Sequence, residues 1–167
     1  MPNWCLNEVR IDGPAKDMRI LSEAFGCHEN LFSFNSFMPV PKELENITEG
    51  GLLNTDTSSI YYYKNLDDGK RMVPVEKQKE LMKKYGACTS YDWKVRNWGC
   101  KWDASLCSNV HTEVSENGDW GSIEVTFETP WGPPEGIYEK IVDMFPDVNI
   151  DWFYKEPNMR LSGWLGD

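Results

Sequence analysis

Long apolar runs are missing from this sequence. No stretch of about 18 apolar residues, the length that a membrane-spanning helix needs, occurs anywhere along the chain. The first residues, Met1 to Cys5, lack the basic region and apolar stretch of a secretory signal. We therefore expect no membrane span and no signal peptide, and we predict a cytoplasmic protein.

Metal-binding and disulfide patterns are also missing. The cysteines number five, form no Cys-x-x-Cys pair, and are joined by only two histidines. A zinc site needs four well-spaced ligands, and an iron–sulfur cluster needs its own cysteine spacing. The sequence therefore predicts free thiols in a reducing compartment, with no metal and no other cofactor. The residues concerned are Cys5, Cys27, Cys88, Cys100, Cys107, His28 and His111.

Catalytic signatures are scarce as well. The chain has no Gly-rich phosphate loop and no recognisable Ser-His-Asp or Cys-His order. Asp92, Asp103 and Glu156 could form carboxylate pairs for acid–base chemistry, but any acidic protein offers such pairs. The sequence favours a protein that binds rather than catalyses, with a hydrolase or transferase left as an alternative.

Basic residues are nearly absent from one part of the chain. The formal charge is −10, from 17 basic and 27 acidic residues. Eleven acids and one base, Lys140, lie between Asp103 and Asp151, whereas ten bases and five acids lie between Lys64 and Lys101. An acidic protein repels phosphate backbones at long range, so direct nucleic-acid binding is disfavoured. The basic stretch is either an exception to this rule or packs against the acidic part.

What the sequence does contain is a regular alternation of apolar and polar residues that predicts strands, together with two amphipathic helices. Their order matches a βαββαβ, ferredoxin-like α+β domain with one antiparallel sheet and both helices on one face. The predicted strands are Trp4–Ile11, Asn109–Ser115, Ser122–Thr129, Val148–Lys155 and a short terminal Arg160–Leu165; the helices are Ala15–Phe25 and one from Trp131–Pro134 to Pro146.

A long insertion, about residues 27–103, separates the first helix from the second strand. It is too long for a bare loop, so we expect structure within a single domain of residues 1–167. Asp12-Gly13-Pro14 predicts a turn, with Pro14 at the first position of the helix. Within the insertion we expect an extended Leu31–Leu44, a loop at Thr48–Gly69 interrupted by a strand at Ile60–Tyr63, a helix at Val75–Tyr85 and a helical or turn-like Tyr91–Trp102.

Several motifs along the chain resemble a known family. They are Pro2-Asn3-Trp4-Cys5-x-Asn7, Phe37-x-Pro39-x-Pro41-x-Glu43-Leu44, Tyr91-Asp92-Trp93-x-x-x-Asn97-Trp98-Gly99-x-Lys101-Trp102-Asp103, Phe127-x-Thr129-x-Trp131-x-Pro133-Pro134, Phe145-Pro146 and Tyr154-x-Glu156-Pro157. Together they resemble the YubB-type ferredoxin-like family of plasmid and bacteriophage proteins. The resemblance implies a ferredoxin-like fold and a mobile-element origin in a bacterial host, but it supplies no catalytic residues.

The tryptophan-rich segment from Tyr91 to Asp103 has two interpretations. Its aromatic side chains could line a pocket whose polar edges bind a nucleotide or a peptide. Alternatively, the tryptophans are buried and clamp the insertion onto the domain, with the polar residues satisfied internally. The pocket candidates are Tyr91, Asp92, Trp93, Asn97, Trp98, Lys101, Trp102 and Asp103.

The polar faces of the predicted strands are acidic. If Ile123, Val125 and Phe127 face the helices, then Glu124, Thr126 and Glu128 face the other way. His111, Glu113, Asp151 and Phe153 would join them there. RNA-binding sheets of this topology present aromatic and basic residues, so carboxylates argue against RNA. Four interpretations of this face stay open. It is solvated or covered by the basic insertion, it binds a metal through His111, Glu113 and Glu124, or it docks on a basic partner.

These observations favour a phage- or plasmid-encoded accessory protein that binds host or defence machinery, with counter-defence as one outcome. The acidic surface candidates are Glu113, Glu124, Glu128 and Asp151. An alternative is a protein or enzyme that binds a small ligand or nucleotide through the segment 91–103. Nucleic-acid binding through the basic stretch is the least favoured hypothesis.

Overall fold

The computed structural model describes residues 3–26, 32–52, 59–64, 71–115 and 117–166. It is a mixed α/β structure with two antiparallel sheets. The chain divides into two compact units. Unit 1 consists of residues 1–39 and 97–167, and unit 2 of residues 40–96. No helix in the described ranges has the length and apolar character to cross a membrane.

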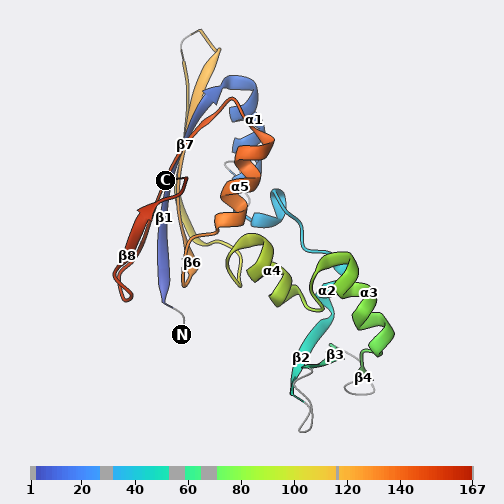
Figure 1. The fold of residues 1–167 in the computed structure, drawn as a ribbon. Coiled ribbons are helices and arrows are strands. Elements are labelled where there is room, and N and C mark those ends of the chain that lie inside the picture. The colour runs from blue at the N-terminus through green and yellow to red at the C-terminus, as the bar shows by residue number, and fades with distance from the viewer. Residues whose placement is uncertain (1–2, 27–31, 53–58, 65–70, 116, 167) are drawn as a thin grey trace. The chain divides into compact units, whose positions relative to one another are not determined.

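Unit 1 is built on a five-stranded sheet with the order β5-β6-β1-β7-β8 (Figure 1). All neighbouring strands run antiparallel, and β1 lies in the centre between β6 and β7. The strands are β1 (Trp4–Pro14), β5 (Ser105–Val114), β6 (Trp120–Pro130), β7 (Asn149–Glu156) and β8 (Leu161–Trp164).

Two helices, α1 (Ala15–Ala24) and α5 (Glu135–Met144), lie on the same face of this sheet (Figure 1). Alternate strand residues on that face are fully buried, including Ile11, Ile123 and Phe127. Each helix buries an apolar stripe against them, such as Ile137 and Ile141 of α5. The period of two in the strands and of 3.6 in the helices therefore defines one core.

Aromatic rings fill much of this core. Phe127 of β6 makes edge-on contacts with Phe32, Phe34 and Trp152, with ring centroids 5.0, 5.9 and 5.7 Å away. Phe34 also packs edge-on against Trp98. These edge-to-face pairs are the arrangement that aromatic quadrupoles prefer. They fix the segment around residues 32–38 and the end of α4 (Ser90–Trp98) within unit 1.

A buried polar network crosses the same core. The Asn7 side-chain amide donates to Thr129 Oγ1 at 2.8 Å and to the Cys5 carbonyl at 3.0 Å. Trp152 Nε1 donates to Asn7 Oδ1 at 3.1 Å, and Thr129 Oγ1 donates to the Gly132 carbonyl at 2.7 Å. Asn7, Thr129 and Trp152 are completely inaccessible to solvent. The network thus satisfies polar groups that would otherwise be buried at considerable cost.

The buried Cys5 thiol makes the stability of unit 1 sensitive to alkaline pH. Burial raises the pKa of this thiol from about 9 to about 11, and the negative charge of Glu156 adds to the effect. Between pH 9 and 11 the thiol of the unfolded chain ionises while the folded thiol stays protonated. Unfolding is therefore favoured by up to about 1.4 kcal/mol per pH unit in this window.

We expect the free energy of unfolding of Cys5→Ala to fall less steeply than that of the native chain over this pH range. Urea denaturation at half-unit pH steps measures both slopes. Other groups titrate in the same window in both proteins, so the difference in slope isolates Cys5. Equal slopes would show that the thiol is not buried as described.

Unit 2 contains a three-stranded sheet and its own small core. Its strands, in the order β2-β3-β4, pack with helices whose buried residues include Leu44, Leu81 and Trp93. Helix α3 ends at Gly86, which adopts a left-handed conformation with φ = +69° and donates its N–H to the Met82 carbonyl. The elements are α2 (Lys42–Glu45), β2 (Ile47–Leu52), β3 (Ser59–Tyr63), β4 (Arg71–Met72), α3 (Val75–Tyr85) and α4 (Ser90–Trp98), whose last two residues belong to unit 1.

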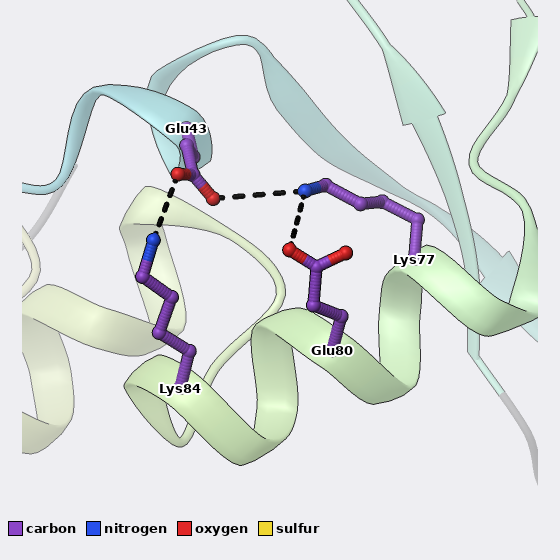
Figure 2. A network of polar contacts seen from close by, with 4 residues as sticks. All are labelled: Glu43, Lys77, Glu80 and Lys84. Carbon is purple, nitrogen blue, oxygen red and sulfur yellow. Dashed lines mark hydrogen bonds and ion pairs between the residues drawn. The ribbon is translucent and has the colours of Figure 1, made fainter.

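A surface network of charges joins α2 to α3 (Figure 2). The Glu43 carboxylate lies 2.9 Å from Lys84 Nζ and 3.7 Å from Lys77 Nζ, and Lys77 also pairs with Glu80 at 3.0 Å. Hydrogen bonding to Lys84 lowers the pKa of Glu43, and the bonds to the carboxylates raise the pKa of Lys77. All four side chains are solvent-exposed to a large degree, so we assign them a local role in orienting α2 rather than a large share of stability.

Several local predictions are confirmed. Helix α3 has the predicted bounds, and β3 contains the predicted strand Ile60–Tyr63. The segment Tyr91–Trp102 is helical as far as Trp98 and then bends. Asn117 to Asp119 form the predicted turn between β5 and β6, in which Gly118 has φ = +73°.

Other local predictions are wrong. Strand β1 does not turn at residues 12–14 but continues through Pro14, which precedes α1 rather than starting it. Pro14 is tolerated because it is the last residue of the strand, where a ladder hydrogen bond can be lost. Strand β2 occupies Ile47–Leu52, where a loop was expected, because its first residues pair with the tyrosines of β3.

The described part of the segment predicted to be extended, Leu31–Leu44, is partly helical. It contains a 3-10 turn, Phe34–Ser36, in addition to α2. Ser33 Oγ accepts from the Asn35 N–H, and Asp103 Oδ1 accepts from the Phe34 N–H at 2.7 Å. These side-chain caps stabilise a turn that the proline spacing alone does not reveal. Leu31 itself lies outside the described residues.

Candidate functional site

The candidate site is the face of the unit 1 sheet opposite α1 and α5, which we call the open face. Residues directly opposite each other in antiparallel strands point to the same side. One cross-strand row on this face consists of His111, Glu124, Arg10 and Asp151, from β5, β6, β1 and β7. The next row contains Thr126, Glu8, Phe153 and Trp164, from β6, β1, β7 and β8.

The open face carries six carboxylates and two basic side chains, Arg10 and Lys155. Arg10 Nη1 pairs with Glu124 Oε1 at 2.8 Å, and both side chains are about half exposed. His111 Nε2 lies 3.1 Å from Glu113 Oε1 at the β5 edge. The face therefore remains negative after its internal ion pairs are counted. The carboxylates are those of Glu8, Asp12, Glu113, Glu124, Glu128 and Asp151.

A hollow of about 390 Å³ lies in this face, across β6, β1, β7 and β8. Its apolar wall is formed by Phe153 and Trp164, whose ring centroids are 5.2 Å apart at an interplanar angle of 56°. Trp164 is 52% exposed although it is a large aromatic side chain. Glu8, Arg10, Glu124 and Asp151 form the polar wall. The hollow combines an aromatic surface with a net negative charge.

The structure brings together the four predicted acidic-surface residues, because Glu113, Glu124, Glu128 and Asp151 all lie on the open face. Their role in binding stays a prediction. Sequence analysis missed Glu8 and Trp164. The alternation in β1 indicated Glu8, whereas Trp164 depends on the pairing of β8 with β7, which no sequence pattern specified.

The tryptophan-rich segment is divided between the two units. Tyr91, Asp92 and Trp93 belong to unit 2, whereas the residues from Asn97 to Asp103 belong to unit 1. Trp93 is 7% exposed and Trp98 is fully buried, with its Nε1–H donated to the Met38 carbonyl at 2.9 Å. Both indoles are therefore structural.

Asp103 also has a structural role. Its carboxylate accepts hydrogen bonds from Ser33 Oγ at 2.6 Å and from the Phe34 N–H. The other two candidate catalytic carboxylates are bound locally as well. Asp92 accepts from Thr89 Oγ1 at 2.7 Å, and the buried Glu156 accepts from the backbone N–H groups of Asn158 and Met159. Asp103 therefore caps the distant turn at Phe34–Ser36, whereas Asp92 and Glu156 bond within their own local turns.

Lys101 and Trp102 remain at the surface of unit 1. Lys101 Nζ lies 4.1 Å from the centroid of the Trp102 ring and 5.9 Å from that of Trp131. Trp102 also contacts Trp4, with ring centroids 6.2 Å apart. This is a cation–π cluster whose ammonium group is already engaged.

A second hollow, of about 560 Å³, lies in unit 2. Tyr61, Met82, Tyr91 and Val95 supply apolar surface, while polar groups include Asp92 and Arg96. Burial raises the pKa of the Tyr61 phenol. Two of the eight predicted pocket residues, Tyr91 and Asp92, line this hollow.

Metal coordination finds no support in the described ranges. No group of three or more His, Cys, Asp or Glu side chains there could hold a metal ion. His111, Glu113 and Glu124 share a face, and His111 contacts Glu113, but the three do not form such a group. Cys27 and His28 lie outside the described residues.

Comparisons with known proteins identify the domain in the C-terminal part of the chain. Residues 101–165 match the model of a family described as the ferredoxin-like domain in Api92-like protein. The crystal structure of the protein Api92 from Yersinia pseudotuberculosis is similar at 11% identity and a TM-score of 0.43, covering 98% of this chain and 93% of that one. No curated protein matches the sequence significantly. Residues 101–165 therefore contain a ferredoxin-like domain.

Proposed function

We propose that this protein is a non-enzymatic binding protein whose open face docks on a basic surface of a partner protein. The observation that carries the proposal is the excess of six carboxylates over two basic side chains on that face. Such a surface attracts a basic partner over a distance of about one Debye length and repels nucleic acid. The overall charge of −10 acts in the same direction.

The partner that we propose is a protein of a bacterial host or of its defence machinery, met in the cytoplasm. This part of the proposal depends on the resemblance to plasmid and bacteriophage proteins. Inhibition of the partner would follow if the acidic face occupied a surface that normally binds nucleic acid. Counter-defence is one outcome of such mimicry.

We also propose a complete βαββαβ arrangement for unit 1, made of β1, α1, β5, β6, α5 and β7. The order β5-β6-β1-β7 supports it, because the split-βαβ topology puts the first strand between the third and the fourth. The residues between α1 and β5 would then be the insertion predicted at about 27–103. β8 would be an addition beside the fourth strand.

A second candidate function uses the hollow of unit 2. The presence of Tyr61, Tyr91 and Arg96 around a concavity of about 560 Å³ favours a small planar ligand there. Metabolite mass spectrometry of the purified chain tests this candidate, and Tyr91→Ala should release any ligand that binds.

Charge reversal tests docking by the open face. We expect Glu124→Lys/Glu128→Lys to weaken capture of the partner from host extract by at least about tenfold at low salt, because rim charges govern association. The native chain should also lose the partner between about 50 and 500 mM salt, as screening removes the attraction. Quantitative mass spectrometry of affinity-purified material measures both effects.

The matched control is Glu135→Lys/Glu139→Lys, which changes the charge equally on exposed positions of α5. This control should retain the partner. Docking by the open face would be ruled out if both charge reversals had the same effect, or if capture did not respond to salt.

A further inference from the structure

The hollow in the open face has features that a general electrostatic surface does not need. Phe153 and Trp164 are directly opposite each other on β7 and β8, and their rings pack together at 5.2 Å. Trp164 nevertheless leaves half of its surface exposed. An exposed indole beside carboxylates offers an attractive surface for a cation, because the ring face is the negative end of its quadrupole.

Two carboxylates beside this aromatic pair are available for a ligand. Glu8 lies opposite Phe153 in the β1–β7 register, and Asp151 lies two residues before Phe153 on the same face. Among the residues that the structure describes, neither side chain forms an ion pair or hydrogen bond. Successive same-face positions on a strand are about 7 Å apart, which is within the span of one long basic side chain.

A guanidinium is already held by the adjoining row. Arg10 lies between Glu124 and Asp151 in the register and pairs with Glu124 at 2.8 Å. With Arg10 included, the hollow contains three carboxylates and one guanidinium, so its formal charge is −2. An anionic ligand would be repelled, whereas one added cation would be attracted.

We propose that this hollow is the anchor pocket for an arginine side chain of the partner, stacked on Trp164 and hydrogen-bonded to Asp151 and Glu8. This inference rests on the proposed function and names the chemistry that the open face recognises. Arginine fits better than lysine because its planar guanidinium stacks on an indole and presents several N–H groups to carboxylates at once. Tryptophan and arginine are also among the residue types enriched at interface hot spots.

The test is NMR titration of the full chain with N-acetyl-arginine amide, followed at the Trp164 indole signal and the amides of β7 and β8. We expect saturable shifts with arginine, weaker ones with N-acetyl-lysine amide, and none with N-acetyl-citrulline amide, the neutral analogue. Trp164→Ala and Asp151→Asn should each weaken arginine binding by at least about fivefold.

The control variants are Trp120→Ala and Asp143→Asn, which alter an exposed tryptophan and an exposed aspartate outside the hollow. Both should bind arginine as the native chain does. Equal shifts with citrulline, or unchanged arginine binding by Asp151→Asn, would overturn the anchor pocket, and the latter variant retains every aromatic contact of the fold.

Capture of the partner separates this inference from the proposed function. If charge reversal abolishes capture while Trp164→Ala and Asp151→Asn retain it, the open face docks but the arginine anchor is wrong. If free arginine binds at the hollow while charge reversal leaves capture unchanged, the pocket exists but the docking function is wrong. Loss of capture in all three variants, with the controls intact, supports both.

Discussion

Trp98→Ala is expected to lower the free energy of unfolding by about 3–5 kcal/mol, the range for large aromatic truncations in a packed core. Trp98 is fully buried, packs edge-on against Phe34 with ring centroids 5.5 Å apart, and donates its Nε1–H to the Met38 carbonyl. Truncation removes all of these contacts and leaves that carbonyl without its indole donor. Because small domains have only about 5–15 kcal/mol of stability, this loss is a large share of the total. Urea denaturation followed by circular dichroism measures it.

Trp102→Ala is the matched control, four residues further along the same segment. Its ring is 44% exposed and contacts Lys101 and Trp4 at the surface of unit 1. We expect a loss of less than about 1 kcal/mol, as for most exposed contacts. If Trp98→Ala kept its stability but lost a bound small molecule, the ligand-pocket interpretation of this segment would be correct instead.

The centre of the unit 1 sheet could be read from the sequence because β1 and β6 are solvated on one face and buried on the other. Ile123, Val125 and Phe127 alternate with charged or hydroxyl side chains, and this period fixes both the strand and the side that each residue faces. The short strands of unit 2 lack that signal. In β2 the sequence Glu49-Gly50-Gly51 has turn composition, and it lies in a strand because the flanking Glu49 and Leu52 pair with β3, with an irregular register between them.

The candidate site was likewise predictable only where strand alternation sets the direction of a side chain. Alternation put the acidic residues of β5, β6 and β7 on one face, but it did not reveal that Trp164 lies beside Phe153. That contact depends on the register across the turn at residues 157–160, which composition does not determine. In the tryptophan-rich segment, a ligand pocket and a structural role for buried tryptophans require the same residue types. Only the burial of each side chain distinguishes the two interpretations.

The structure also explains several motif residues by packing rather than by chemistry. Gly99 has φ = +87°, and a Cβ atom there would lie 3.0 Å from the backbone nitrogen of Glu135. A side chain at this position would therefore meet both an unfavourable backbone conformation and the start of α5. Asn7 and Thr129, from two further motifs, form the buried network beside Trp152.

Asn7→Leu is expected to lower the free energy of unfolding by about 2–4 kcal/mol, although leucine has a similar size and is more apolar. The change leaves Trp152 Nε1 buried without its acceptor and removes the donor to the Cys5 carbonyl and to Thr129 Oγ1. An unsatisfied buried polar group costs about 1–3 kcal/mol, and three groups lose a partner here, of which Thr129 Oγ1 keeps its bond to the Gly132 carbonyl. Chemical denaturation measures the loss, with Asn149→Leu as control, since Asn149 is exposed and bonds only to Asp12 at 3.2 Å among the described side chains.

A double-mutant cycle with Trp152→Phe tests whether the hydrogen bond is the cause. Phenylalanine has no N–H group, so in the Trp152→Phe background Asn7→Leu leaves no buried indole donor without an acceptor. We expect the cost of Asn7→Leu to fall by about 1–2 kcal/mol in the Trp152→Phe background, a coupling typical of residues in one network. If the two costs simply add, the bond from Trp152 Nε1 to Asn7 Oδ1 is not the cause of the loss. A coupling of the expected size would instead show that Asn7, a residue of the first motif, acts by satisfying the buried indole of Trp152, which makes that residue a determinant of folding.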